Sequence, residues 1–386
     1  MLYYRFRPSG ELSLKELLYD EMFFTSTSEC NDPFDGASLF SFGCDEERWT
    51  RLIEHAWGRV EFESKSDLAR SLAKMISSKC PLSLSDAQTV AFDECLKHLA
   101  GLGPLTAVGL AGQLREFVRL YEPRRPYFVS FTKTASNPLM WAHYASMHQG
   151  HCLVFRSLDG GLRQDADRRK NIARRNTRGG LAPSITVDLP EILRFEEVIY
   201  DDGTGPGDAF TCFPQPVAGL TLSEEDRLSL NASLLRQVLT KHTCWRYEQE
   251  ARIILTPPSS WLFGTPVELS SFERLFHFMP SQLVGIVLGA RMHSAMRERV
   301  REIVLARSAQ LARKLEKGGP YLDFVMFQAH LVPSERALAI EPVELVSLGT
   351  VVPKGSPTFS AKLTAWEAGR GLLFREGGAS QKQFEE

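Results

Sequence analysis

The sequence lacks long apolar runs and an excess of charge of either sign. No apolar run in its 386 residues reaches the roughly 18 residues that a membrane-spanning helix needs. The first residues, MLYYRFRPSG, contain no apolar stretch of the signal-peptide kind. Lysine and arginine total 45 against 47 aspartates and glutamates, which gives a net charge of −2. We therefore expect a cytoplasmic protein that does not enter a membrane and does not coat nucleic acid over its whole surface.

Cysteine pairs at metal-binding spacing and several catalytic signatures are also missing. The seven cysteines are scattered with no CxxC pair, which argues against a zinc ribbon or a disulfide framework and predicts reduced, mostly buried thiols. The chain has no GxGxxG, P-loop, kinase signature set or GxSxG string, and the spacing of zinc deaminases is absent. We predict no metal site, because the nearest histidine group, at 143, 148 and 151, spans a helix end, a turn and a strand.

The start of the chain predicts a compact strand–helix–strand unit. Apolar and aromatic runs at 2–6 and 21–26 are typical of strands, and leucines at helical spacing favour a short helix at 11–19. The string SECNDPFDG at 28–36 is rich in turn-forming residues. Its NDPFD part, at 31–35, has two interpretations: an Asx turn that satisfies backbone donors, or polar groups in a pocket wall.

Residues 45–121 have a different pattern, dominated by helical periodicity with few β-branched runs. Four helices are predicted, near 45–58, 64–77, 84–99 and 106–121. The breaks between them fall at Pro81 and around the glycine-rich turn at 101–104. We interpret this region as a helical insertion, and it contains no recognisable catalytic motif.

From residue 122 onward, strands and helices follow one another in mixed order. Strands are predicted at 127–132, 151–155, 195–200, 251–255, 283–289 and 322–331, and helices at 137–146, 223–242 and 292–317. This order favours an α+β fold with a mixed or antiparallel β core over a doubly wound α/β fold. The predicted organisation is a discontinuous core domain (1–44 and 122–370), a helical insertion (45–121) and a disordered tail (371–386).

The stretch 157–187 is a charged, glycine-containing loop with a basic run at 163–178. One interpretation is a solvated loop without a partner. The other is an arm that contacts the phosphates of nucleic acid or another anionic ligand. Both remain open at this point.

Charged residues in otherwise apolar strands give the sharpest chemical signal. Glu248 and Glu250 lie two residues apart in WRYEQEAR, so in an extended segment both point to the same side. Paired carboxylates suit ribose binding, general-base work or stabilisation of an oxocarbenium ion. The alternative is an ion pair with Arg252, which would share their face. A buried Arg5 also needs a carboxylate or a bound anion, so we expect it to face Glu248, Glu250 or a diphosphate.

The string WAHY at 141–144 lies in the predicted helix at 137–146. Trp141 and Tyr144 are three residues apart and therefore neighbours on one helix face. Together with His143 they predict an aromatic cluster near a pocket.

Six segments, in this order, resemble the bacterial domain-of-unknown-function family 2971. They are LYYRFRP, FFTSTSECNDPFDG, FVSFTKTASNPLMWAHYASMHQGHCLVF, RFEEVIY, KHTCWRYEQEARIIL and LVGIVLGARM. More distantly, the order of residues resembles that of ADP-ribosyltransferases, which have an aromatic residue with Arg or His on a first strand, a Ser or Thr on a second and a late glutamate. Here these would be Tyr4 or Arg5, then Ser130 or Thr132 (or the serine of FTSTS, residue 26), then Glu250.

This resemblance implies an NAD-using ADP-ribosyltransferase or NAD glycohydrolase, as in a bacterial toxin or an anti-phage defence effector. Glu250 would stabilise the oxocarbenium-like transition state, and Glu248 would activate the acceptor, which is protein, nucleic acid or water. The expected NAD-binding residues are Tyr4, Arg5, Ser130, Trp141, His143 and Tyr144. Two alternatives stay open: a nucleic-acid-binding or nucleic-acid-processing effector, and a non-catalytic sensor or adaptor whose helical insertion binds a protein partner.

Overall fold

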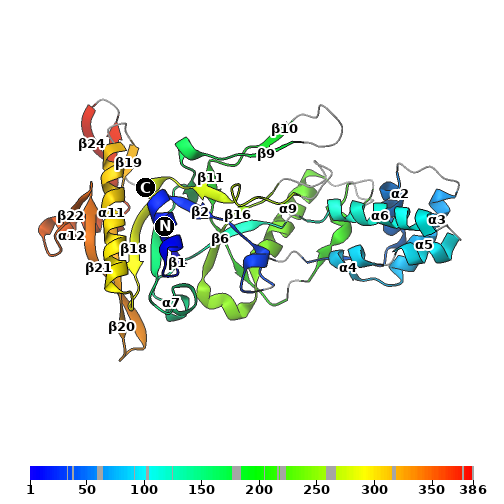
Figure 1. The fold of residues 1–386 in the computed structure, drawn as a ribbon, viewed down its shortest axis with the longest axis horizontal. Helices are drawn as coiled ribbons and strands as arrows, with labels where there is room; N and C mark the ends of the chain where they lie inside the picture. The colour runs from blue at the N-terminus through cyan, green and yellow to red at the C-terminus, as the bar shows by residue number, and fades with distance from the viewer. Residues whose placement is uncertain are drawn as a thin grey trace.

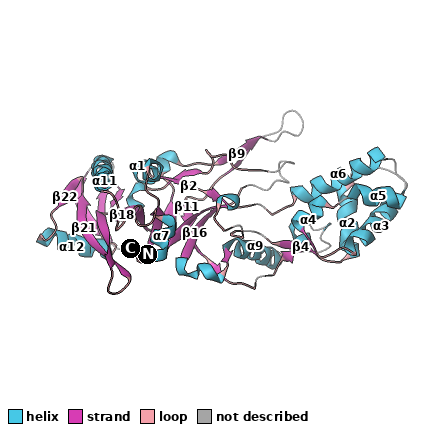
Figure 2. Ribbon diagram, turned by 60° about the horizontal axis from the view of Figure 1, so that its bottom comes forward, coloured by secondary structure: helices cyan, strands magenta, loops and turns pink. Residues whose placement is uncertain are grey.

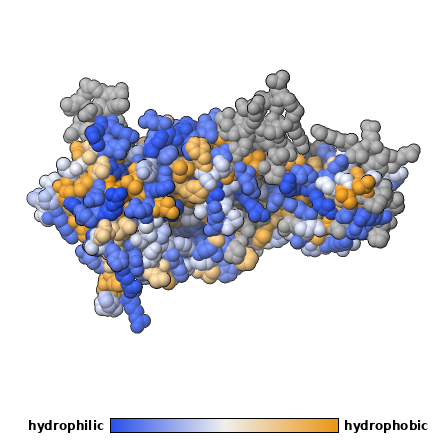
Figure 3. Space-filling model, in the orientation of Figure 1, coloured by the Kyte–Doolittle hydropathy of each residue, from blue (hydrophilic) through white to orange (hydrophobic). Residues whose placement is uncertain are grey.

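The computed structural model is elongated, with a large β-sheet at one end and a helical subdomain at the other (Figure 1). It describes residues 1–32, 34–36, 39–58, 64–90, 92–100, 104–123, 125–175, 184–203, 205–214, 217, 223–257, 267–314, 319–375 and 378–384. In this part of the chain, no helix is both long enough and apolar enough to cross a membrane. On the face drawn in Figure 3, apolar side chains form separate groups among polar ones.

A ten-stranded sheet forms the core, in the order β12-β16-β6-β1-β7-β18-β20-β21-β22, with β3 added on β6. In that order the strands are Glu196–Glu197, Glu250–Leu255, Tyr127–Thr132, Leu2–Arg7, His151–Arg156, Leu283–Leu288, Phe324–Val332, Ala337–Ser347 and Thr350–Val352, with β3 at Thr25–Ser26. All neighbours are antiparallel except β18 and β20, which run parallel. The predicted α+β fold with a mixed sheet is therefore confirmed.

Helices cover both faces of this sheet, which explains why its central strands are continuously apolar. In Figure 2, α11 (Ser294–Lys314) and α1 (Lys15–Tyr19) lie on one side, and α7 (Pro138–Tyr144) and α12 (Pro357–Glu367) on the other. Leu17 and Val300 belong to the core on the first side, and Trp141 and Trp366 to the core on the second. All six residues of β7 are buried between these layers.

The backbone pairing between the neighbouring strands β1 and β6 is short. Strand β1 pairs with β7 along its whole length, but with β6 only where Tyr4 faces Thr132. Beyond that pair the two strands part, and the Arg5 guanidinium donates to the Ser130 carbonyl at 3.0 Å in place of a backbone bond. The candidate site lies at this parting.

The helical subdomain has a core of its own, separate from those of the sheet. Its helices are α2 (Glu46–Ala56), α3 (Lys65–Ser77), α4 (Leu84–Thr89), α5 (Phe92–Ala100) and α6 (Pro104–Leu120). The single helix predicted at 84–99 is divided, because Val90 has a non-helical ψ of 133°. Phe210 and Phe213, from far along the chain, complete this core, and no local pattern in the sequence predicts their contribution.

Three small sheets and one long helix accompany these two bodies. Strand β4 (Phe40–Phe42) pairs with β5 (Leu82–Ser83) and β14 (Gly207–Asp208), β2 (Glu21–Phe23) with β17 (Leu275–His277), and β13 (Ile199–Tyr200) with β15 (Thr240–Lys241). The helix α9 (Glu224–Leu239) leads directly into β15. The C-terminal end of α9 thereby places Lys241 beside the large sheet.

Two segments expected to lack regular structure contain strands. Within 157–187, β8 (Gly161–Arg163) pairs with β11 (Ile192–Arg194), and β9 (Ile172–Arg175) with β10 (Ser184–Val187), while 176–183 lie outside the described residues. In the expected tail, β23 (Gly371–Arg375) pairs with β24 (Gly378–Phe384) and with β19 (Gly319–Tyr321). Backbone pairing with a distant strand orders β23, and such pairing leaves no local signal in the sequence.

Candidate functional site

A cleft of about 400 Å³ lies where β1 and β6 part. Its walls come from β1, β6, α7, the turn near residue 31 and the segment around Lys241 to Glu250. Seven of the eight predicted site residues line it: Tyr4, Arg5, Ser130, His143, Tyr144, Glu248 and Glu250. Segments more than a hundred residues apart in the chain therefore bring these side chains together.

The two carboxylates reach the cleft by a route that differs from the expected extended segment. Glu248 ends the 3-10 helix at Thr243–Glu248, and Gln249 takes a left-handed conformation with φ 44°. Glu250 then begins β16, opposite Thr132 of β6. The alternation expected of an extended strand is thus wrong here, but the reversal at Gln249 still directs both carboxylates toward one ammonium group.

That ammonium group belongs to Lys241, which the sequence analysis did not single out. Its Nζ lies 2.6 Å from Glu248 Oε2, 3.0 Å from Glu250 Oε2 and 3.3 Å from Asp35 Oδ2. Arg252 completes the cluster with 2.8 Å from its Nε to Glu250 Oε1 and a bond to Asp35. The alternative pairing of Glu250 with Arg252 is confirmed. All five side chains are at most 4% exposed, and their formal charges sum to −1.

The cluster separates the acidities of its two glutamates. Burial alone would raise the pKa of Glu250, but Arg252 and Lys241 more than offset this and hold its pKa at about 2. For Glu248, burial prevails over Lys241 and over the hydrogen bond from Tyr144, so its pKa is raised from 4.5. Neighbouring carboxyl groups with divergent pKa values are typical of acid–base sites.

The two glutamates also differ in their free hydrogen-bonding capacity. A carboxylate offers about four lone-pair positions. Glu250 accepts two bonds from Arg252, one from Lys241 and one from the Ser130 hydroxyl. Glu248 accepts one from the Tyr144 hydroxyl at 2.5 Å and one from Lys241 at 2.6 Å. Glu248 is therefore the carboxylate with capacity left for a ligand.

Arg5 has a different partner from the one we expected. Its Nε lies 3.0 Å from Glu16 Oε2 of α1, and not beside Glu248 or Glu250. Arg7, two residues along the same face of β1, also approaches Glu16, at 3.4 Å. Burial would raise the pKa of Glu16, but these two arginines lower it. Because two guanidinium groups share one carboxylate, this wall of the cleft keeps a net positive charge.

Trp141 is the predicted site residue that does not line the cleft. Its side chain is fully buried, its Nε1 donates to the Ala135 carbonyl at 2.6 Å, and its ring meets the Phe6 ring edge-on at 5.0 Å. The expectation that Trp141 binds NAD is therefore wrong, because its side chain is not accessible to a ligand. It fixes α7 against the sheet, so that the next turn of the helix presents His143 and Tyr144.

The turn at 31–35 combines both interpretations of its string. Asp32 accepts the Phe34 amide at 2.9 Å, as in an Asx turn. Asn31 and Asp35 line the cleft, and the Asn31 amide lies 3.5 Å from the Tyr144 hydroxyl. Within one short turn, one residue shapes the backbone and two contribute to the site.

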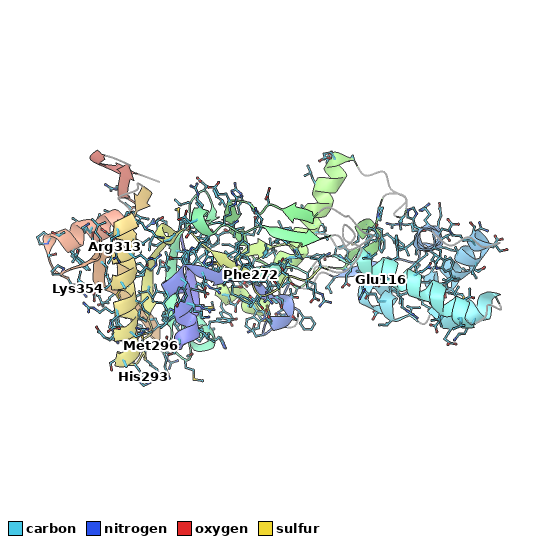
Figure 4. All side chains as sticks on the ribbon, turned by 45° about the horizontal axis from the view of Figure 1, so that its top comes forward. Glu116, Phe272, His293, Met296, Arg313 and Lys354 are labelled. Atoms are coloured by element: carbon cyan, nitrogen blue, oxygen red, sulfur yellow. The ribbon has the colours of Figure 1, made fainter. Side chains whose placement is uncertain are left out.

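The basic run at 163–178 uses its described side chains within the protein. Arg168 bonds Asp165 at 2.5 Å, and Arg169 donates to the Leu189 carbonyl at 2.7 Å. Lys170 donates to the carbonyl of Phe272, whose position is labelled in Figure 4. The other basic side chains of the run past residue 172 lie outside the described ones. Among the residues that the structure describes, no group of three or more His, Cys, Asp or Glu side chains could hold a metal ion.

All seven cysteines are free, as expected, although only Cys95 and Cys152 are buried. Cys30 lines the cleft, where burial and Asp35 raise the pKa of its thiol to about 11. A thiol of that pKa is a poor nucleophile near neutral pH. Cys30 is therefore not a candidate nucleophile of the cleft.

Comparison with known proteins finds a partial match to one family model. Residues 140–253 match the family described as "Protein of unknown function (DUF2971)". The matched segment includes His143, Tyr144, Lys241, Glu248 and Glu250. Neither the curated proteins nor the solved structures contain a match to this chain.

Proposed function

We propose that this chain is an ADP-ribosyltransferase-like enzyme that cleaves the bond between nicotinamide and ribose in NAD. The convergence of seven predicted residues on one cleft is the observation that carries this proposal. A site needs its groups within reach of a single ligand, and these come from three strands, an α-helix and a 3-10 helix. The parting of β1 and β6 supplies a slot between strands for an extended dinucleotide.

The charges in the cleft complement two groups of the reacting NAD, its diphosphate and its cationic ribosyl group. The wall with Arg5 and Arg7 carries the net positive charge that favours a diphosphate. The opposite wall carries Glu248, whose negative charge stabilises the cationic ribosyl group as nicotinamide leaves. Arg252 and Lys241 already occupy hydrogen-bonding positions of the Glu250 carboxylate. We therefore propose that Glu250 holds this wall in place and that Glu248 stabilises the ribosyl cation and accepts the proton.

The proposed reaction balances without a further reagent. The bond between ribose C1′ and the nicotinamide nitrogen breaks, and its electron pair stays on nicotinamide. A lone pair of the acceptor forms the new bond to C1′, and the acceptor proton moves to Glu248. General-base help of this kind contributes about 10²- to 10⁴-fold in rate. The raised pKa of Glu248 makes it a stronger base than an ordinary carboxylate.

Nicotinamide release from NAD by the purified chain tests the proposal. The measurement is made with water as the acceptor, and again with total bacterial protein and nucleic acid added as acceptors. We expect release by the wild type and by Glu47→Gln, a control at an exposed glutamate in the helical subdomain. The proposal is wrong if the wild type leaves NAD intact under both conditions.

A further inference from the structure

Four aromatic side chains form a row that begins in the cleft. We call Tyr144, His143, Tyr247 and Trp245 the aromatic row. The ring centroids follow one another at 6.2, 6.3 and 6.1 Å. The first two residues come from α7 and line the cleft, and the last two come from the 3-10 helix that ends at Glu248.

The aromatic row is partly open to solvent, in contrast to the other tryptophans that the structure describes. Trp49, Trp57 and Trp141 are fully buried, and Trp366 is 4% exposed. Trp245 and Tyr247 are only half-buried, and His143 is exposed. In the described part of the chain, no protein group accepts a hydrogen bond from the Trp245 indole or the Tyr247 hydroxyl. Half-exposed rings with free polar ends are typical of binding surfaces.

The aromatic row flanks the group that takes the acceptor proton in the proposed reaction. Tyr144 donates to Glu248, Tyr247 precedes it in the chain, and the Lys241 ammonium lies 5.1 Å from the Trp245 ring centroid. An acceptor in contact with Glu248 must therefore lie beside these rings. Arg246, exposed between Trp245 and Tyr247, donates only to the Tyr200 carbonyl, at 3.4 Å, and has no carboxylate within 4 Å among the described residues. An unpaired cation at this point attracts phosphate and repels a guanidinium group.

We infer that the aromatic row stacks the bases of a single-stranded nucleic acid and presents one of them as the acceptor. This inference rests on the proposed function and names its acceptor class. Aromatic rings combined with a basic group bind single strands with little sequence preference, because every base has a π-face. The ring spacing is nearly twice the roughly 3.4 Å rise per nucleotide of a stacked strand, so bases on neighbouring rings are unstacked from one another.

The transfer to such a base follows from the same site. A ring or exocyclic nitrogen of the base attacks ribose C1′ as nicotinamide departs with its electron pair. The N–H proton of that nitrogen passes to the Glu248 carboxylate. The products are an ADP-ribosylated base and free nicotinamide.

Fluorescence anisotropy of a labelled single-stranded oligonucleotide, without NAD, tests the binding step on the full chain. Stacking is worth about 5- to 150-fold in affinity per base. We expect losses in this range for Trp245→Ala and Tyr247→Ala, and retention of most binding by Trp245→Phe, which keeps a ring and guards against misfolding. Phe272→Ala is the matched control, because that ring is 73% exposed but outside the aromatic row. Equal affinities of wild type and Trp245→Ala overturn the inference, as does displacement of the oligonucleotide by an arginine-rich peptide but not by a second oligonucleotide.

Mass spectrometry of the oligonucleotide after addition of NAD then separates the two proposals. The inference predicts an added ADP-ribosyl group in the wild type and in Phe272→Ala, and its loss in Trp245→Ala. Ring-dependent binding without any consumption of NAD would contradict the proposed function and leave the stacking surface standing. Consumption of NAD without ring-dependent binding or base modification would contradict the inference about the acceptor and leave the proposed function standing.

Discussion

Replacing Lys241 with methionine removes the cation that joins three buried carboxylates. The Lys241 side chain is 4% exposed, and its three partners come from the turn at Asp35, the 3-10 helix and β16. Methionine has a similar length and can fill the same volume, so the loss is mainly electrostatic. The formal charge of the cluster changes from −1 to −2, and Arg252 is left as its only cation.

The expected loss of stability is large and confined to the sheet. Breaking a buried ion pair by removing one partner costs about 3–5 kcal/mol, which is at least a hundredfold in an opening equilibrium. Strand β16 carries Glu250 and Arg252 of the cluster and pairs with β6, whereas α2 and α3 belong to the separate core of the helical subdomain. We therefore expect opening of the sheet around the cluster and no change in those helices.

Hydrogen–deuterium exchange measures this effect segment by segment. Amides of β6 and β16 should exchange at least a hundredfold faster in Lys241→Met, and those of α2 and α3 at unchanged rates. Lys97→Met, which removes a surface pair with Glu94, is the control and should change nothing measurable. The double variant Lys241→Met/Glu250→Gln should lose less protection than the sum of its parts. Unchanged exchange in β16 would refute the electrostatic account.

Three further predictions follow from the cluster and its surroundings. The pKa of Glu250 falls from 4.5 to about 2 on folding, so its ionised carboxylate stabilises the folded state by about 3 kcal/mol. This stabilisation is complete above pH 4.5 and is lost as the pH falls toward 2. Acid unfolding of Glu250→Gln should lack this component. Tyr144→Phe removes a bond that lowers the pKa of Glu248, so the acidic limb of the pH–rate profile should move to higher pH. Trp141→Ala should destabilise the chain by about 3–5 kcal/mol in urea unfolding, because it removes a fully buried ring from the core, and an unchanged unfolding free energy would contradict this structural role.

Local patterns predicted most elements of the fold. The strands at 127–132 and 151–155 were predicted from apolar runs, and the helices at 45–58 and 64–77 from their periodicity; each ends within two residues of its predicted bounds. Strand β21 was missed, and it contains Pro342, which is atypical of a strand interior. The register shift between Met326 and Phe327 of the preceding strand β20 accommodates the proline.

The site was predictable where its groups are neighbours in the sequence and not where they are distant. Glu248 and Glu250 stand out in the string KHTCWRYEQEARIIL, which begins with Lys241. The cation that joins the two carboxylates could therefore have been predicted from the same string. The bond between Arg252 and Asp35 spans 217 residues, and no local pattern encodes it. Arg5 was assigned the wrong carboxylate although Glu16 lies only 11 residues away, because the packing of α1 on the sheet, and not a local pattern, brings the two side chains together.

Separate measurement of NAD binding and NAD turnover by Glu248→Gln tests the central claim most directly. The amide keeps the size of the side chain but cannot accept a proton or balance a ribosyl cation. We predict a Kd for NAD, by titration calorimetry, within a few fold of the wild type, together with a kcat for nicotinamide release that is lower by about 10²- to 10⁴-fold. A Glu248→Gln variant that binds NAD and turns it over at the wild-type rate would contradict the account.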